Sequence, residues 1–195
     1  MGNNKPSSLK FAVLMGTGAF FAAVFFSFFS EIVLPKLQLI MLSFLSLLVV
    51  IFVGIIFDMI GIAVAVADEK WFHAKASKKL RGAGQSILMI RHAAKVATIC
   101  NDVVGDICGT VSGVFGVAIV FQLASERPTW DKSIMTMVMT GIVASLTVGG
   151  KALAKNKAMH DSREIVGMVG HILAWFETST GLNLFALNRR RDRRR

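Results

Sequence analysis

Long apolar runs with few charges dominate the pattern of hydrophobic and polar positions along this 195-residue chain. A helix of about 20 apolar residues crosses the hydrocarbon core of a bilayer. Four runs approach or exceed that length: Phe11 to Leu34, Leu37 to Ala67, Val96 to Phe121 and Ser133 to Gly150. The pattern therefore predicts an all-α integral membrane protein with four transmembrane helices.

The first run has a competing interpretation, because Lys5 and Lys10 precede it as they would precede the apolar part of a signal peptide. The run is longer than that part usually is, and no small-x-small cleavage pattern follows. Glu31 and Pro35 stand there instead. We therefore expect a retained membrane helix that forms a tight hairpin with the second run across Pro35.

Polar and amphipathic segments complete the predicted organisation. The segment 68–95 is polar and basic, and Gly82-Ala-Gly84 divides it into two short helical pieces. From about Asp161 to Leu187, apolar residues recur at helical spacing, which predicts an amphipathic juxtamembrane helix. We expect this helix to lie along the membrane face or on a partner helix.

Composition and charge agree with this picture and add an orientation. The chain is 54% hydrophobic and 17% charged, yet its net charge is +10. Lysine and arginine gather at the N-terminus, in 68–95 and at the C-terminus, and such segments stay in the cytoplasm. We therefore expect a multi-pass protein of the cell membrane with both termini cytoplasmic.

The arginine-rich end, Arg189 to Arg195, has two interpretations. A run of this kind could bind RNA or DNA. Contact with anionic lipid on the cytoplasmic side explains it more simply, since that side already attracts basic segments. We expect the lipid bilayer as a partner and no nucleic acid.

An enzyme is the function class that the sequence supports least. We find no nucleophile–base set, phosphate-binding loop or zinc pattern, and the four histidines are scattered. Cys100 and Cys108 are eight residues apart, roughly 12 Å along a helix, which is too far for a disulfide. We expect two free, buried thiols and no catalytic residues.

Polar groups within the apolar runs are the candidate functional residues. A charge at membrane depth costs at least about 2.5 kcal/mol, so such groups usually face a partner or a water-filled path. The second run carries Asp58, and the third carries Asn101, Asp102 and Asp106. Counted from the cytoplasmic ends of their runs, all four come to one level in the cytoplasmic half of the membrane.

Carboxylate and amide oxygens at one level suit a hard cation, Mg²⁺ or alternatively Na⁺. Two other interpretations stay open. The carboxylates pair with Lys95 or Arg91 at the interface, or the helices begin later and leave the acids in water. A cation site is the hypothesis with a functional consequence.

Small residues recur every four positions in the last two runs. The third run contains Gly105, Gly109 and Gly113, and the fourth contains Gly141, Ser145 and Gly149. Such ladders let helix backbones approach closely. They predict helix packing, either within the chain or across a dimer.

Three short motifs follow one another with characteristic spacing: Phe57-Asp58-Met-Ile-Gly61-Ile-Ala63, then Cys100-Asn101-Asp102-Val-Val-Gly105-Asp106, then Gly150-Lys151-Ala-Leu-Ala154-Lys155. In their order, residues 37–187 resemble the membrane domain of the cyclin M/CorB family of magnesium transporters. That domain has three membrane helices, a basic helical connection and a juxtamembrane helical belt. The family patterns are Phe-Ser-x-x-Glu-x-Ala, Gly-Asn-x-x-x-Asn and Gly-Glu-x-x-Pro-Lys.

The chain departs from these patterns at several positions. Asp58 replaces the family serine, and Gly61 replaces its glutamate. Gly105 stands at the second asparagine, and Lys151 and Ala154 replace glutamate and proline. The CBS-pair domain of the family is missing, and an N-terminal helix is added. These changes favour a membrane protein that does not transport.

The resemblance implies a homodimeric Mg²⁺ transporter in which Asp58 and Asn101 bind the cation. Asp102 and Asp106 are added to this predicted ligand set only because of their depth in the membrane. The implied organisation is 1–36 as N-terminal tail and first transmembrane helix, 37–187 as CorB-like membrane domain, and 188–195 as basic tail. The second hypothesis is a non-transporting membrane scaffold or regulatory protein that acts through helix packing and a basic cytosolic face.

Overall fold

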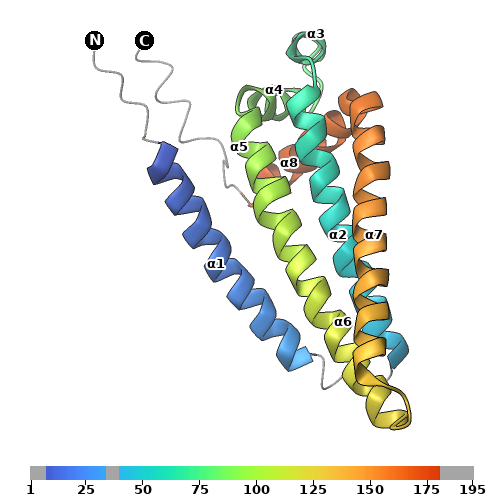
Figure 1. Cartoon of the computed structure of the whole chain (residues 1–195). Coiled ribbons are helices and arrows are strands. Elements are labelled where there is room, and N and C mark those ends of the chain that lie inside the picture. The colour runs from blue at the N-terminus through green and yellow to red at the C-terminus, as the bar shows by residue number, and fades with distance from the viewer. Residues whose placement is uncertain (1–7, 34–39, 181–195) are drawn as a thin grey trace. The chain divides into compact units, whose positions relative to one another are not determined.

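A computed structural model describes residues 8–33 and 40–180. Every regular element in these ranges is a helix, which confirms the all-α prediction for the described part of the chain. In order they are α1 Ser8–Val33, α2 Ile40–Val66, α3 Glu69–Ser77, α4 Ala83–Arg91, α5 Ala93–Ala97, the π-helical segment η2 Thr98–Gly105, α6 Asp106–Glu126, α7 Lys132–His160 and α8 Ser162–Thr180 (Figure 1).

Within residues 8–33 and 40–180, three helices are long and apolar enough to cross a membrane. They are α2, the continuous helix Ala93–Glu126 formed by α5, η2 and α6, and α7. The apolar section of α1 that meets the same test of composition, Ala12–Phe28, is shorter. A set of three membrane-length helices is therefore established, and the fourth crossing and the orientation stay predictions.

The last membrane helix ends later than its apolar run suggested. The run stops at Gly150, but α7 continues through Lys151, Lys155 and Lys157 to His160. Alanine and lysine are strong helix formers, and no proline or glycine interrupts this stretch. The helix predicted for 161–187 begins at Ser162 and reaches Thr180. Its remainder, the Pro35 hairpin and the basic tail lie outside the described residues.

The chain divides into two compact units, and the first comprises Met1–Phe57 and Asn101–Leu153. Its core forms around α6, which buries Ile107, Val111, Phe115 and Ile119 at intervals of four residues. Side chains of α2 and α7 complete this core, and α1 packs beside α6. Within the unit, Ser43 donates a hydrogen bond of 3.1 Å to Gln122.

Large apolar side chains cover the outside of the same unit. Met41 of α2 is 85% exposed and Met137 of α7 is 72% exposed. Because a soluble monomer rarely exposes apolar surface of this extent, the pattern agrees with helices surrounded by lipid.

The second unit comprises Asp58–Cys100 and Ala154–Arg195. Its core contains Phe72, Val64 and Val166, each fully buried. Helix α4 packs against both α3 and α8. The prediction of two short helices in the basic segment 68–95 is confirmed by α3 and α4.

Local signals in the sequence explain the ends of α3 and α4. Asp68 caps α3 by accepting a hydrogen bond from the Lys70 amide at 2.9 Å. Gly82 precedes α4 with a φ of +83°, in the left-handed region that favours glycine. A side chain there would also meet the backbone of His171 at 2.6 Å.

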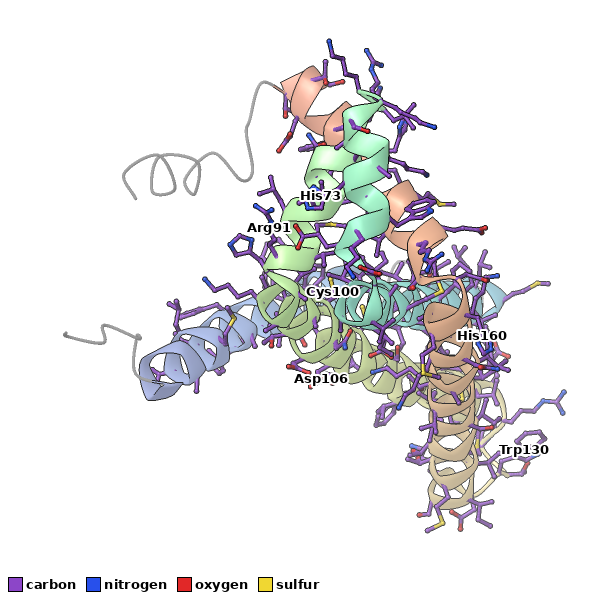
Figure 2. All side chains as sticks on the ribbon, turned by 90° about the horizontal axis from the view of Figure 1, so that it is seen from above. His73, Arg91, Cys100, Asp106, Trp130 and His160 are labelled. Carbon is purple, nitrogen blue, oxygen red and sulfur yellow. The ribbon has the colours of Figure 1, made fainter. Side chains whose placement is uncertain are left out.

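An ion-pair cluster joins α3 to α4. The Glu69 carboxylate accepts hydrogen bonds from Arg91 Nε at 2.7 Å and pairs with His73 Nε2 at 2.9 Å. Figure 2 shows Arg91 and His73 close together around this position. The pKa of Glu69 lies below its ordinary value, mainly because of its hydrogen bond with Arg91 and secondly because of its hydrogen bond with His73.

Candidate functional site

Asn101 lies in a stretch of π-helix inside a membrane-length helix. The segment η2 spans Thr98–Gly105, between α5 and α6. A π-helix bonds each residue to the fifth one along and is rare, and its short occurrences gather at functional sites. Nothing in the spacing of apolar residues signals this conformation, so sequence reasoning missed it.

The side-chain oxygen of Asn101 is buried and, among the described residues, accepts no hydrogen bond. An orphan acceptor of this kind costs about 1–3 kcal/mol. Because native proteins leave few such atoms, each one calls for an explanation, and an ion is one of the usual ones. Asn101 is therefore the strongest of the four predicted cation ligands.

Asp102 and Asp106 lie on either side of the end of η2 and are exposed. Asp106 is the first residue of α6 and lies inside the continuous helix Ala93–Glu126. The backbone oxygen of Asp106 accepts a hydrogen bond from Thr110 at 3.0 Å. Both carboxylates thus stand within five residues of Asn101 and stay accessible from outside the chain.

Asp58 belongs to the second unit, whereas Asn101, Asp102 and Asp106 belong to the first. Asp58 is half-buried on α2 and already takes part in an interaction within the chain. Its convergence with Asn101 on one cation stays a prediction. Among the described residues, no three His, Cys, Asp or Glu side chains form a group that could hold a metal.

Two small residues of the helix Ala93–Glu126, Gly105 and Gly116, pack closely against other helices of the first unit. A Cβ at Gly54 of α2 would lie 2.8 Å from Cys108 Cβ and 3.9 Å from the carbonyl oxygen of Gly105. A Cβ at Gly116 would lie 3.3 Å from Val143 of α7. These glycines let α2 and α7 approach α6, as small residues do in membrane helices.

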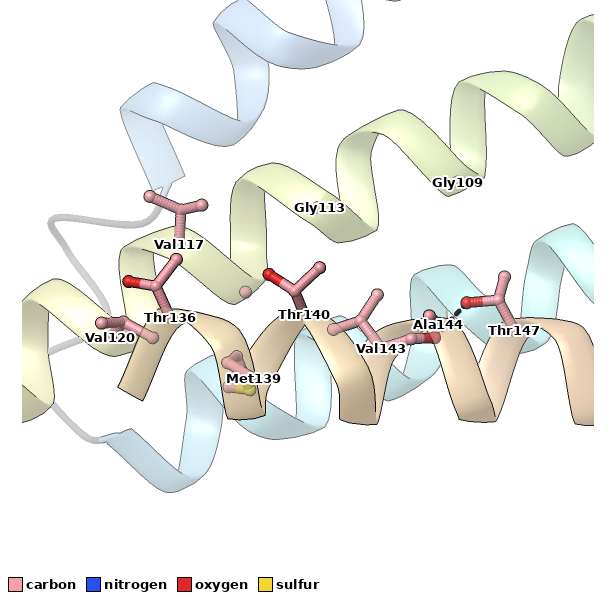
Figure 3. Close-up of a pocket in the computed structure, with 11 residues that line it drawn as sticks. Gly109, Gly113, Val117, Val120, Thr136, Met139, Thr140, Val143, Ala144 and Thr147 are labelled. Atoms are coloured by element: carbon pink, nitrogen blue, oxygen red, sulfur yellow. Dashed lines mark hydrogen bonds between the residues drawn. The ribbon is translucent and has the colours of Figure 1, made fainter. Parts of the chain in front are cut away.

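The rest of the ladder is open. Gly109 and Gly113 line a groove of about 220 Å³ between α6 and α7 (Figure 3). Thr136, Thr140 and Thr147 line its other side. The sequence signal for these threonines is their spacing of four and seven residues, which places them on one helix face.

The small residues of α7 face outward. A Cβ at Gly141 or Gly149 would meet no atom within 4 Å, and Ser145 is exposed. Gly105 of the predicted ladders therefore lies in a close helix contact inside the unit. The other ladder positions are not covered by any described residue.

Comparison with protein-family models, with characterised proteins and with solved structures finds no match for this chain. The similarity to the cyclin M/CorB membrane domain accordingly rests on the three sequence motifs. In the residues that the structure describes, the chain is all-helical with three membrane-length helices, one of which carries an orphan amide oxygen in a π-helical turn.

Proposed function

We propose that the chain binds Mg²⁺ between its membrane helices and transports it. The observation that carries the proposal is the buried, unpartnered side-chain oxygen of Asn101. Mg²⁺ takes oxygen ligands and keeps several of its waters, so one amide oxygen and one or two carboxylates are enough protein ligands.

The chemistry of the neighbouring residues supports the same choice of ion. Asp102 and Asp106 supply negative charge within one turn or so of Asn101. The described membrane helices offer no histidine near this position. Softer transition metals prefer nitrogen and sulfur ligands, whereas Mg²⁺ and Na⁺ prefer oxygen. Asp58 completes the ligand set that we propose from the sequence.

Replacement of Asn101 by leucine separates cation binding from packing. In EDTA we expect Asn101→Leu to raise the thermal stability of the detergent-purified protein, because an orphan oxygen costing about 1–3 kcal/mol is removed. We expect Mg²⁺ to stabilise the wild type and to have no effect on the variant. A variant that is stabilised by Mg²⁺ as strongly as the wild type would contradict the role of Asn101.

Transport is tested in vesicles that contain a Mg²⁺-sensitive dye. We expect wild-type protein to admit Mg²⁺ and the double variant Asp58→Ala/Asn101→Ala to give the signal of protein-free vesicles. Glu126→Gln is the matched control, since it removes an exposed carboxylate from the far end of the same helix. Equal flux through the wild type and the double variant would exclude the proposed site.

A second candidate function is a membrane scaffold or regulator, and the uncovered small residues favour it. Gly109, Gly113, Gly141 and Gly149 have room for another helix. Replacement of Gly109 and Gly113 by alanine would narrow the space for such a helix, and a Cβ at either position meets no described atom within 4 Å. Loss of a co-purifying partner, with no Mg²⁺ effect on the wild type, would support this function over transport.

A further inference from the structure

A pocket of about 410 Å³ lies between α8 and the turn that joins α3 to α4, entirely within the second unit. Its lining includes the basic side chains of Lys75, Arg81 and His171 and no carboxylate. Fully buried Phe72 forms part of its wall. The pocket therefore combines an apolar wall with a concentration of positive charge.

These basic groups have no acidic partner among the described residues. Two carboxylates of the surrounding helices are held elsewhere: Glu69 by Arg91 and His73, and Glu177 by the amide of Gln85 at 2.9 Å. The ammonium of Lys75 lies over the Trp71 ring, 3.8 Å from its centroid. The positive charge of the pocket is therefore left for an outside anion.

The start of α4 adds to the attraction for an anion. Ala83, the first residue of this helix, lines the pocket, and its amide donates a hydrogen bond of 3.3 Å to the carbonyl oxygen of Leu80. The first turn of α4 contains no acidic residue. The positive end of the helix dipole favours an anion at such a position.

An exposed apolar strip on α8 borders the pocket. Met168, Ile172 and Trp175 are 66%, 56% and 65% exposed, and their spacing places them on one helix face. His171 lies three residues after Met168 and four before Trp175, so it stands at the edge of this strip. A phosphate in the pocket would thus have a hydrocarbon-binding surface beside it.

We propose that the pocket binds the phosphate of an anionic phospholipid whose acyl chains lie along the Met168–Ile172–Trp175 strip. Arg81 is exposed at the rim and contacts the phosphate with its planar guanidinium, which matches phosphate oxygens in pairs. Lys75 supplies further charge from one wall, and His171 supplies an imidazole from the other. The strip selects a lipid over a soluble phosphate, because only a lipid covers it.

The test uses the full chain in detergent and measures its thermal stabilisation during titration with dioctanoyl phosphatidylglycerol. We expect a saturable shift for the wild type and an apparent affinity at least about tenfold weaker for Lys75→Gln/Arg81→Gln, since charge-assisted hydrogen bonds are lost. Lys78→Gln/Lys79→Gln is the matched control. It removes two positive charges from the same segment outside the pocket lining, and we expect wild-type affinity.

Two further ligands identify the source of the phosphate. We expect dioctanoyl phosphatidylcholine and glycerol 3-phosphate to give no saturable shift at the same concentrations. An equal shift with either ligand would overturn the proposal, as would equal affinities of the pocket and control variants. If the pocket double variant fails to fold, the exposed single change Arg81→Gln, compared with Lys78→Gln, decides the question in the same way.

Discussion

At the scale of single residues, the contact between α4 and α8 depends on side chains that are small. Ser86 is fully buried and donates a hydrogen bond of 3.0 Å to the carbonyl oxygen of Val166. Gly170 faces Ser86 so closely that a Cβ would overlap the Ser86 hydroxyl and lie 2.7 Å from the carbonyl oxygen of Gly82. The two helices therefore meet backbone to backbone.

Gly170→Ala should destabilise the protein by about 1–3 kcal/mol, because the added methyl group has no space and the backbone must move. Gly84→Ala is the control on the facing helix, since nothing lies within 4 Å of a Cβ there. We expect the control to stabilise the protein by about 0.5–1 kcal/mol through the lower flexibility of alanine in the unfolded chain. Thermal unfolding in detergent measures both, and equal effects would contradict the close contact.

Residue patterns indicated some of these features and not others. Gly82 marked the break between α3 and α4, because glycine supplies a left-handed turn that other residues rarely adopt, whereas Gly84 lies inside α4. The spacing of apolar residues gave no indication of the partner of Gly170. Helix contacts depend on which faces meet, and a single helix period does not contain that information. For the same reason, the sequence predicted Asn101 as a cation ligand but did not predict that its side-chain oxygen is buried.

At the scale of helices, α3 and α4 are joined by the Glu69–Arg91 ion pair on the surface of the second unit. Its contribution to stability depends on pH, because Arg91 lowers the pKa of Glu69 from its ordinary value of 4.5. A lowered folded-state pKa means that the contribution is complete above pH 4.5. It is lost as the pH falls through the lowered value.

Glu69→Gln should therefore lower the unfolding temperature slightly at pH 7, as an exposed ion pair contributes little. The difference between variant and wild type should close as the pH falls below 4.5. Glu164→Gln, which removes an exposed carboxylate from the first turn of α8, serves as a control for general charge effects. A difference that persists unchanged at low pH would show that the ion pair is not its source.

Helix ends were predicted less accurately than helix cores. The apolar run of α7 ended at Gly150, yet the helix includes three lysines and continues to His160. Hydropathy marks where a helix leaves the membrane, whereas backbone hydrogen bonding decides where it stops. Lysine is polar and also a good helix former. The end of the apolar run and the end of the helix are therefore about two to three turns apart here.

At the scale of the whole molecule, length and composition predict which helices can cross a membrane, and charge predicts their orientation. Three helices of the described part of the chain have membrane length. Their presence was predictable because a run of about 20 apolar residues has few other uses in a protein. The side of each loop depends on the membrane and the insertion machinery, so it requires a direct measurement.

Single-cysteine labelling tests this topology after Cys100 and Cys108 are replaced by alanine. We expect an impermeant thiol reagent to label Thr129→Cys on intact cells and to label Ser77→Cys only after the cells are opened. The helix Ala93–Glu126 lies between these positions, so labelling of both from one side would contradict its span. Ser7→Cys should behave like Ser77→Cys if α1 crosses the membrane, and like Thr129→Cys if it does not.

The π-helical turn at Thr98–Gly105 has a consequence for comparing this chain with any relative. A wider helical turn accommodates an additional residue. Side chains before and after it therefore do not follow the single helical spacing of a regular α-helix. A relative with a regular helix here would align only with a one-residue gap, and deletion of one residue turns everything beyond it by about 100°. Motif spacings counted across Asn101 therefore compare different helix faces unless that gap is placed.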